Sequence, residues 1–327
     1  MIKVLYLPLN FGDVCQNPWI QDAFQSLGCQ VEIFDYFQVY QAERKKIGKV
    51  REILINKAKS FKPDLLHLQI QHTTIINGDT IARIKQALPN LIVSNWTIDC
   101  RAFVPKSYKD VAKFSDFNFI SSTGQIEMFK RELKKPVHYL QIGYNPKLYY
   151  PETEPRTNFP YDCIFIGNHN PKERYPGAQA RLDTCKLLRE KFKQRFCLYG
   201  HGWPRPLRSK SSIDQRTVAQ AYHQSKCVIS VSHFNDIDHY FSDRLLMCMA
   251  SGRPTIQLYF PKYESYFTNN CDLLIAKDIR DIAVKVDWVI QNPAMANYIG
   301  QSGAAKVFAE HTYLSRMNEL LNVVGLL

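Results

Sequence analysis

Short hydrophobic runs alternate with amphipathic segments from the start of the chain to about residue 141. The apolar runs predict strands at 2–7, 31–34, 64–69, 91–96, 117–121 and 137–141. The segments between them predict helices at 18–27, 41–60, 80–87, 111–114 and 124–133. Continuous apolar strands that alternate with helices are typical of a parallel sheet covered on both faces. The pattern therefore predicts a doubly wound, Rossmann-like domain.

A second alternation begins after a segment that has no clear period. Residues 144–160, YNPKLYYPETEPRTNFP, hold four prolines, which is typical of a linker. Beyond it, strands are predicted at 163–166, 196–199, 227–231, 255–258 and 273–275, and helices at 178–191, 218–225, 244–250, 279–291 and 294–323. We therefore expect an α/β chain of two Rossmann-like domains, 1–150 and 151–327, that face one another across a cleft. The last helix is a candidate to return to the first domain.

Composition excludes several classes of protein. The 327 residues are 45% hydrophobic and 22% charged, which argues against a disordered or fibrous chain. No stretch approaches the ~20 apolar residues needed to cross a bilayer. The nine cysteines form no CxxC pair, which argues against a zinc knuckle or a disulfide framework. The opening run, MIKVLYLP, is too short for a secretory signal, so we expect a cytoplasmic protein.

Basic residues exceed acidic ones, and the excess is clustered. Lys and Arg number 42 against 30 Asp and Glu, a net charge of +12. Residues 44–62 hold eight Lys or Arg and one acid, and residues 172–216 hold twelve and four. Such clusters favour an anionic partner, either nucleotide phosphates, nucleic acid or an acidic membrane face. A solvated, soluble surface is the alternative interpretation.

The strand predicted at 163–166 runs directly into Gly167 and Asn168. A glycine at this point lets the backbone approach a ligand, and Arg174 and Arg181 follow it. Arg181 lies near the start of a predicted helix, where the amide dipoles favour an anion. This segment is a candidate diphosphate clamp, although an ordinary strand-to-helix turn would have the same pattern.

Another predicted strand ends in Tyr199-Gly200-His201-Gly202. Such a turn can line a pocket for a nucleotide base with its backbone N–H and C=O groups. A tight turn without a ligand fits the sequence equally well. We therefore assign Tyr199, Gly200 and Gly202 provisionally to a donor site.

A polar segment precedes the apolar helix predicted at 244–250. Ser242 or Asp243 is the candidate helix cap, and Gly252 suits the position just after the helix. The helix N-terminus attracts anions, and Arg244 there is placed to contact a phosphate. These features predict a second part of the same donor site.

The segment from Arg244 to Pro254 resembles the donor-site signature R-x-x-E-x-x-A-x-G-x-P of GT-B glycosyltransferases. With the two glycine-containing turns before it, the order of motifs is similar to that of the CgeB-like branch, over roughly residues 95–310. The resemblance implies a nucleotide-diphosphate sugar as donor, such as a UDP-sugar, with its phosphates on Arg244. The family Glu, which binds the ribose, is replaced by Met247. Glu264 matches a second family acid.

Asp99 and Arg101 follow another predicted strand, at the carboxyl edge of its sheet. A general base that deprotonates an acceptor hydroxyl suits this place. The Asp-x-Arg pattern is similar to that of phage DNA β-glucosyltransferases, which implies that Asp99 is the base of an inverting transfer. His72 is the rival base, and a capping role for Asp99 is the alternative. The turn with Asn10 and Gly12, together with Arg101, is assigned to the acceptor.

Asp236 and Asp238 form an Asp-x-Asp pattern with histidines nearby. This pattern holds a metal in the GT-A architecture, which lacks the second Rossmann half that we predict here. We therefore expect no metal bound by the protein. A free Mg²⁺ that assists the diphosphate stays open.

Together these features predict a GT-B glycosyltransferase that transfers a sugar to a hydroxyl acceptor. The leading acceptor is a 5-hydroxymethylated pyrimidine in double-stranded DNA, because of the Asp99 motif and the net positive charge. A CgeB-like transfer to a protein, a surface glycan or a small molecule is the alternative. Met247 motivates a third hypothesis, an inactive nucleotide-sugar-binding module. Retention at the anomeric carbon stays open, and the sequence predicts no oligomeric state.

Overall fold

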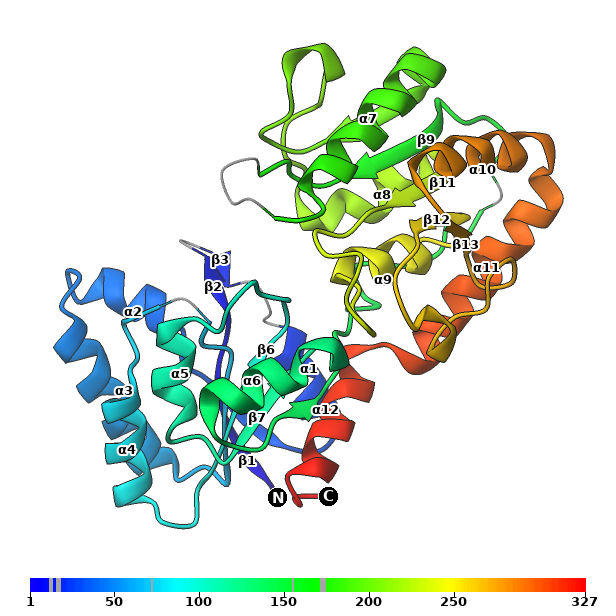
Figure 1. The fold of residues 1–327 in the computed structure, drawn as a ribbon. Helices are drawn as coiled ribbons and strands as arrows, with labels where there is room; N and C mark the ends of the chain where they lie inside the picture. The colour runs from blue at the N-terminus through cyan, green and yellow to red at the C-terminus, as the bar shows by residue number, and fades with distance from the viewer. Residues whose placement is uncertain (12–13, 16–18, 72, 155, 171–174) are drawn as a thin grey trace. The chain divides into compact units, whose positions relative to one another are not determined.

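The computed structural model describes residues 1–11, 14–15, 19–71, 73–154, 156–170 and 175–327 (Figure 1). The chain forms two compact units. The first comprises Met1–Ile142 together with Tyr313–Leu327, and the second comprises Gly143–Thr312. Each unit is a parallel sheet with helices on its faces, so the fold is α/β.

The first unit is built on a six-stranded sheet with the order β4-β1-β5-β6-β7-β8. Its strands are β1 (Lys3–Leu7), β4 (Gln30–Ile33), β5 (Leu65–Leu68), β6 (Ile92–Thr97), β7 (Phe117–Ile120) and β8 (His138–Tyr139). All neighbouring strands pair in parallel. The strand order reverses between β1 and β5. Ligand sites of doubly wound sheets lie outside the carboxyl ends of the strands at such a reversal.

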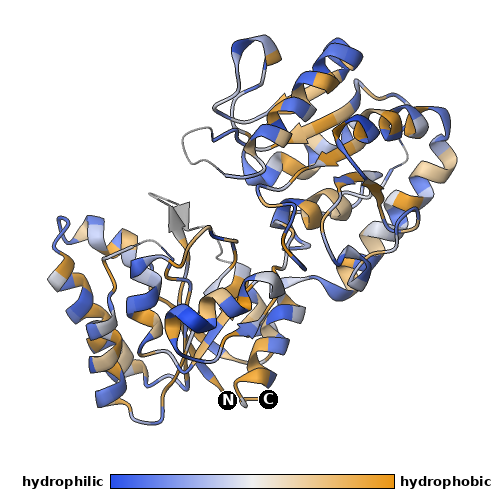
Figure 2. Ribbon diagram, in the orientation of Figure 1, coloured by the Kyte–Doolittle hydropathy of each residue, from blue (hydrophilic) through white to orange (hydrophobic). Residues whose placement is uncertain are grey.

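Helices connect these strands and cover the sheet. They are α1 (Trp19–Ser26), α2 (Tyr36–Ala42), α3 (Ile47–Phe61), α4 (Gly78–Ala87), α5 (Lys106–Ala112), the short 3₁₀ helix η1 (Thr123–Gln125), α6 (Ile126–Leu133) and α12 (Tyr313–Val323). Figure 2 shows hydrophobic and hydrophilic residues alternating along these helices, as expected for helices with one buried face.

One prediction for this unit is corrected. The basic segment 41–60 is not one helix, because Arg44 and Lys45 have left-handed backbone angles, with φ of 51° and 64°, and separate α2 from α3. The side chain of Asp35 caps α2 by accepting from the N–H groups of Phe37 and Gln38. Next to the turn expected around Asn10, the residues of β2 (Asn10–Phe11) pair antiparallel with those of β3 (Val14–Cys15).

The second unit is built on a five-stranded parallel sheet with the order β10-β9-β11-β12-β13. Its strands are β9 (Tyr161–Ile166), β10 (Phe196–Tyr199), β11 (Ser225–Ser230), β12 (Thr255–Leu258) and β13 (Leu274–Ala276). Its helices are α7 (Ala178–Phe192), η3 (Lys193–Arg195), η4 (Arg205–Leu207), η5 (Gln215–Thr217), α8 (Val218–His223), α9 (Asp243–Ala250), η6 (Tyr263–Ser265), α10 (Ile279–Gln291) and α11 (Pro293–Glu310). The strand order reverses between β9 and β11.

The helix predicted over 294–323 is in fact two helices, α11 and α12. They are separated at His311 and Thr312, whose backbone pairs with Tyr144: the Tyr144 N–H donates to the His311 carbonyl at 3.1 Å. Beyond this break, α12 packs against α1 in the first unit. Arg316 of α12 also donates from Nε to the carbonyl of Ile142 at 3.2 Å. No proline or glycine stands at 311–312, so the sequence pattern did not signal the break.

Candidate functional site

A cavity of about 250 Å³ opens at the carboxyl end of β9, where the strand order of the second unit reverses. Its lining comes from the loops after β9 and β10, from the start of α9, and from the segments before and within α8. The lining residues are Tyr149, Ile166, Gly167, Asn168, Gly200, Ser212, Ile213, Gln215, Val218, Tyr222, Asp243, Arg244 and Met247. This is the place at which a doubly wound sheet binds its ligand.

Arg244 lies in the first turn of α9 and is fixed to the end of β9. Its Nε donates to the carbonyl of Ile166 at 2.7 Å, and its guanidinium lies 5.6 Å from the ring centre of Phe165. A Cβ at Gly167 would lie only 2.9 Å from Arg244 Nη2, so the loop needs glycine to approach this closely. Within the described part of the chain, the buried Arg244 Nη1 has no hydrogen-bond partner. The guanidinium therefore keeps donors available for an anion in the cavity.

The loop after β9 is locked to the loop after β10. Asn168 Oδ1 accepts from the His201 N–H at 2.9 Å, and Trp203 Nε1 donates to the Gly167 carbonyl at 2.9 Å. A Cβ at Gly200 would lie 2.2 Å from that same carbonyl, and Gly200 has a φ of +123°. These contacts hold the floor of the cavity in one shape.

Arg181 of α7 is buried directly behind the cavity, with 1% of its surface exposed. Its Nε donates to the Val231 carbonyl at 2.8 Å, and its Nη1 donates to the Asn168 carbonyl at 3.2 Å and lies 2.5 Å from His233 Nε2. Burial, followed by the charge of Arg244, lowers the pKa of Arg181. Arg181 therefore ties the loops after β9 and β11 together, and adds positive charge without lining the cavity.

His233 is the neutral partner in this arrangement. Burial, followed by the charge of Arg181, lowers its pKa to about 3. Its Nε2 is then a hydrogen-bond acceptor at neutral pH, which suits the Arg181 donor. No carboxylate among the described residues forms an ion pair with Arg181 or Arg244. The carboxyl end of β9 therefore carries two guanidinium groups that form no ion pair within the described residues, and the acid nearby is Asp243, whose charge acts to raise the pKa of Arg181.

The other wall of the cavity is more apolar. Met247 and Asp243 both line it and lie one turn apart on α9, with Val218 and Tyr222 of α8 nearby. Burial, followed by the charge of Asp243, raises the pKa of Tyr149, so this hydroxyl stays protonated. The carboxylate that α9 offers to the cavity is therefore Asp243, because position 247 is Met.

The structure does not bring every predicted donor residue to the cavity. Tyr199 points its hydroxyl toward Lys210 Nζ, at 3.4 Å, and Gly202 lies against the backbone of His169. Glu264 is exposed on η6 and does not line the cavity. Arg174 lies outside the described residues.

Several lining residues were missed by the sequence analysis. Tyr149 comes from the proline-rich segment, and Ser212, Ile213 and Gln215 come from the long connection after β10. The backbone bridge between Tyr199 and Lys210 brings that connection back to the sheet. Neither segment has a periodic pattern, so nothing in the sequence marked these residues.

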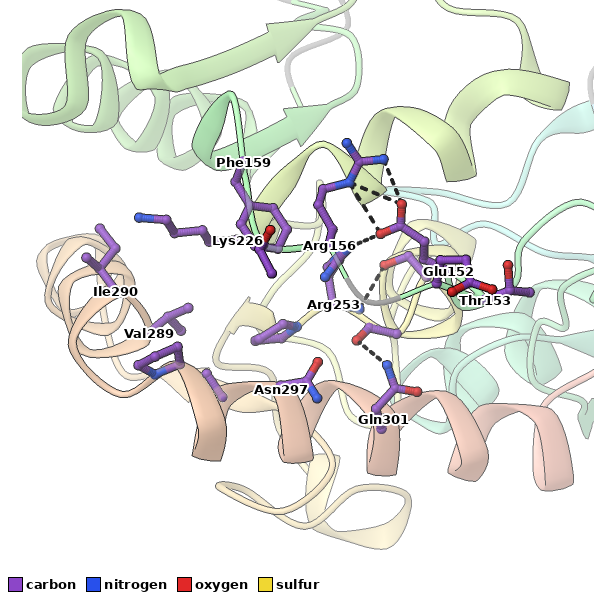
Figure 3. Close-up of a pocket in the computed structure, with 17 residues that line it drawn as sticks. Glu152, Thr153, Arg156, Phe159, Lys226, Arg253, Val289, Ile290, Asn297 and Gln301 are labelled. Atoms are coloured by element: carbon purple, nitrogen blue, oxygen red, sulfur yellow. Dashed lines mark hydrogen bonds and ion pairs between the residues drawn. The ribbon is translucent and has the colours of Figure 1, made fainter.

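A larger cavity, of about 630 Å³, lies near the amino ends of β11 and β12, at the other edge of the sheet (Figure 3). Figure 3 shows Arg156 and Arg253 both directed to Glu152. Arg253 also stacks on Phe159, 4.7 Å from the ring centre. The two arginines of this larger cavity are thus paired with Glu152, in contrast to Arg181 and Arg244. We therefore place the candidate site in the smaller cavity.

In the first unit, Asp99 and Arg101 follow β6 and lie close together. Arg101 Nη2 is 3.4 Å from Asp99 Oδ2, and it also donates to Gln71 Oε1. The Gln125 side chain accepts from the Arg101 N–H at 3.0 Å and donates to its carbonyl at 2.6 Å. The Asp99 side chain is 44% exposed, so its carboxylate is accessible from solvent.

The loops after β1 and β5 meet beside this pair at the carboxyl edge of the first sheet. Gln69 Oε1 accepts from the Tyr6 hydroxyl at 2.7 Å and from the Leu9 N–H at 3.3 Å. Of the predicted residues here, His72 and Gly12 lie outside the described residues, and only the backbone of Asn10 is described, in β2. The glutamines at 69, 71 and 125 were not predicted, because isolated polar residues carry no pattern.

Two further observations concern metals and membranes. Among the described residues, no three His, Cys, Asp or Glu side chains gather in a way that would hold a metal ion. Asp236 and Asp238 lie in the loop between β11 and α9. In the same part of the chain, no helix has the length and apolar character needed to cross a membrane.

A model of the glycosyl transferase-like family matches residues 181–322, which include α9 and most of the second unit. No curated protein matches the sequence significantly. Solved structures give much longer matches, although their sequences are distant.

Sucrose-phosphate synthase from Thermosynechococcus elongatus is 14% identical, with a TM-score of 0.65 and 99% of each chain covered. Anabaena HepE, solved with UDP and glucose, is 10% identical, with a TM-score of 0.67 and 100% of each chain covered. An α-glucosyltransferase solved with UDP and a 13-mer DNA that contains an HMU base is 11% identical, with a TM-score of 0.65 and 99% of each chain covered. The chain thus has the GT-B fold, and its residues 181–322 are similar to the glycosyl transferase-like family.

Proposed function

We propose that the protein transfers the sugar of a UDP-sugar to the hydroxymethyl group of a 5-hydroxymethylated pyrimidine in DNA. The observation that carries the donor half is the pair Arg244 and Arg181. Both lie at the strand-order reversal of the second sheet, and neither has an ion-pair partner among the described residues. A diphosphate supplies the charge that such a pair lacks.

Within the cavity, each group has a distinct role. Arg244 and the N-terminus of α9 bind the diphosphate and stabilise the charge that grows on it as the sugar leaves. The fixed loops at Gly167 and Gly200 position the nucleotide, and Arg181 acts as a positioning residue that holds the first of these loops. Related structures of the same fold hold UDP or UDP-glucose, which supports this class of donor.

Asp99 acts as the general base. The acceptor oxygen attacks the anomeric carbon, the bond from that carbon to the diphosphate oxygen breaks, and its electron pair leaves with UDP. Asp99 takes the acceptor proton. Arg101 Nη2 lies 3.4 Å from this carboxylate. Attack from the face opposite UDP inverts the anomeric carbon, so an α-linked donor yields a β-glycoside.

DNA as the acceptor is supported by charge and by one structural relative. Arg44, Lys45, Lys46 and Lys49 are exposed around the turn between α2 and α3, and none forms an ion pair within the described residues. Four unpaired cations in six residues suit a phosphate backbone. The relative solved with UDP and HMU-containing DNA has the same fold over 99% of both chains.

The decisive experiment measures transfer from labelled UDP-glucose to duplex DNA that contains one 5-hydroxymethylated pyrimidine. Asp99→Asn should lower kcat by about 10²- to 10⁴-fold, because general-base catalysis supplies that order of acceleration. Its UDP affinity should stay near that of the wild type. Asp79→Asn, which changes an exposed acid at the start of α4, is the matched control.

Other results would each reject part of the proposal. Unchanged turnover of Asp99→Asn would remove Asp99 as the base, and an α-glycoside product would show retention. Transfer to a protein, a surface glycan or a small molecule but not to DNA would favour the CgeB-like alternative. Met247 in the cavity favours a second candidate, a nucleotide-sugar-binding module, and tight UDP-glucose binding without hydrolysis or transfer would support that function.

A further inference from the structure

The loop between β6 and α5 presents an exposed phenyl ring. Phe103 is 72% exposed, and among the large apolar side chains of the described residues only Met1, at 92%, is more exposed. A single exposed aromatic residue is common on protein surfaces. This one differs in its position, because it lies four residues after Asp99 on the loop that carries the proposed base.

The loop is anchored on both sides of the ring. On one side, the N–H and carbonyl of Arg101 are both hydrogen-bonded to the Gln125 side chain. On the other side, Val104 is 4% exposed and packs in a core cluster with α5 and α6 residues, and Pro105 caps α5. Fraying of the loop therefore does not account for the exposed ring. The structure holds it away from the core.

The ring is within reach of an acceptor bound at Asp99. Four residues span at most about 14 Å even when fully extended, which bounds the separation of the Asp99 and Phe103 Cα atoms. A side chain at Phe103 is therefore close enough to contact a DNA duplex whose target base lies at Asp99.

We propose that Phe103 is a wedge that enters the base stack of the DNA acceptor and fills the place of the flipped nucleotide. The inference rests on the proposed function, since it presumes DNA as the acceptor. The hydroxymethyl group of a stacked and paired base is not free to enter an enclosed site, so the base must leave the helix. Apolar side chains inserted between base steps are the usual means of stabilising such distorted DNA.

The test compares three acceptors that differ only in how firmly the target base is held. They are a paired duplex, the same duplex with an abasic site opposite the target, and the single strand. Phe103→Ala should lower kcat/KM on the paired duplex about 10- to 100-fold, in line with the loss of one aromatic–base stack. On the other two acceptors the loss should be less than about threefold, since the base is already free to leave. Phe103→Trp should restore activity on the paired duplex.

A second measurement reports flipping directly. With 2-aminopurine beside the target, wild-type protein should raise the fluorescence and Phe103→Ala should not. Phe114→Ala is the matched control: Phe114 is also exposed, at 37%, but follows the end of α5, and it should behave as wild type on all three acceptors. Thermal melting of each variant shows that it is folded.

Two outcomes overturn the inference and leave the proposed function intact. One is an equal loss on all three acceptors for Phe103→Ala, which indicates a general acceptor contact. The other is no loss on any of them. If the wild-type protein hydrolyses UDP-glucose but modifies none of the three DNA acceptors, the proposed acceptor fails and the wedge fails with it.

Discussion

Arg244 Nε donates to the carbonyl oxygen of Ile166 at 2.7 Å, and this bond joins the first turn of α9 to the last residue of β9. The strand thereby fixes the guanidinium at the carboxyl end of the sheet. Its remaining N–H groups face Gly167, which has no side chain to block them. A cation held in this way binds an anion without first losing conformational freedom.

Replacement of Arg244 tests this arrangement. We expect Arg244→Gln to weaken UDP binding about 10- to 100-fold, because a hydrogen bond to a charged group is worth roughly 1.5–3 kcal/mol. Uridine binding should change little, since uridine has no phosphate. Titration calorimetry with both ligands measures this difference. Arg280→Gln, at an exposed position of α10, is the control. An equal loss for uridine and UDP would contradict a phosphate contact.

Met247 allows a gain-of-function test of the cavity wall. We expect Met247→Glu to strengthen UDP binding, because a carboxylate at this position accepts hydrogen bonds from the ribose hydroxyls. Met247→Gln serves as the uncharged control. The gain should disappear with 2′,3′-dideoxy-UDP, which lacks both hydroxyls. If Met247→Glu instead weakens UDP binding, the ribose does not lie beside α9.

His67 predicts a dependence of stability on pH. It is fully buried in β5, and burial lowers its pKa from 6.5 to about 3. Below pH 6.5 the unfolded chain therefore binds a proton that the folded chain excludes, and stability falls as the pH falls toward 3. Between pH 7 and pH 5 this residue alone should lower the free energy of unfolding by about 2 kcal/mol.

The variant His67→Phe isolates this effect. The ring stacks on Tyr6, 5.6 Å between centres, so an aromatic replacement keeps the packing while removing the titrating group. Denaturant unfolding at pH 7 and pH 5 should show a smaller loss in His67→Phe than in the wild type. His201→Asn, an exposed position in the second unit, should show the wild-type loss. Equal losses in all three proteins would mean that His67 is protonated in the folded state.

The turn between α2 and α3 predicts how DNA binding depends on salt. Lys45→Gln with Lys46→Gln should weaken duplex binding and reduce the slope of log K against log salt by about two, since each phosphate contact contributes roughly 0.9. The matched control changes Lys59 and Lys62, near the other end of α3, where Lys62 is also left-handed, with φ of 51°. Fluorescence anisotropy at several salt concentrations measures both slopes. If the slope falls in the Lys59 and Lys62 control but not in the Lys45 and Lys46 variant, the DNA contacts the other end of α3 and not this turn.

Most of the strands were predictable because they are buried on both faces, the edge strands β4 and β8 excepted. β5 and β12, for example, are buried along their whole length, so an unbroken apolar run marks each of them. All eleven strands of the two parallel sheets lie within two residues of their predicted ends. The interruptions at Arg44–Lys45 and His311–Thr312 were not predictable, because no glycine or proline stands there.

The residues that line the cavity of the second unit were predicted only in part, because only some of them stand at the end of a regular element. Gly167, Asn168 and Arg244 stand where a strand or helix meets a loop, and such junctions are visible in the sequence. Residues such as Tyr149 and Gln215 reach the cavity through irregular segments whose path depends on the tertiary fold. Burial of Arg181 was also hidden, since a basic residue at a helix start is usually solvated.

Because α12 belongs to the first unit, that unit is discontinuous in the chain. During synthesis, the surface of α1 that α12 covers stays bare while the 170 residues of Gly143–Thr312 are made. At synthesis rates of about 5–20 residues per second this interval lasts roughly 10–30 s. An apolar helix face that waits this long for its partner is open to aggregation until α12 has been made.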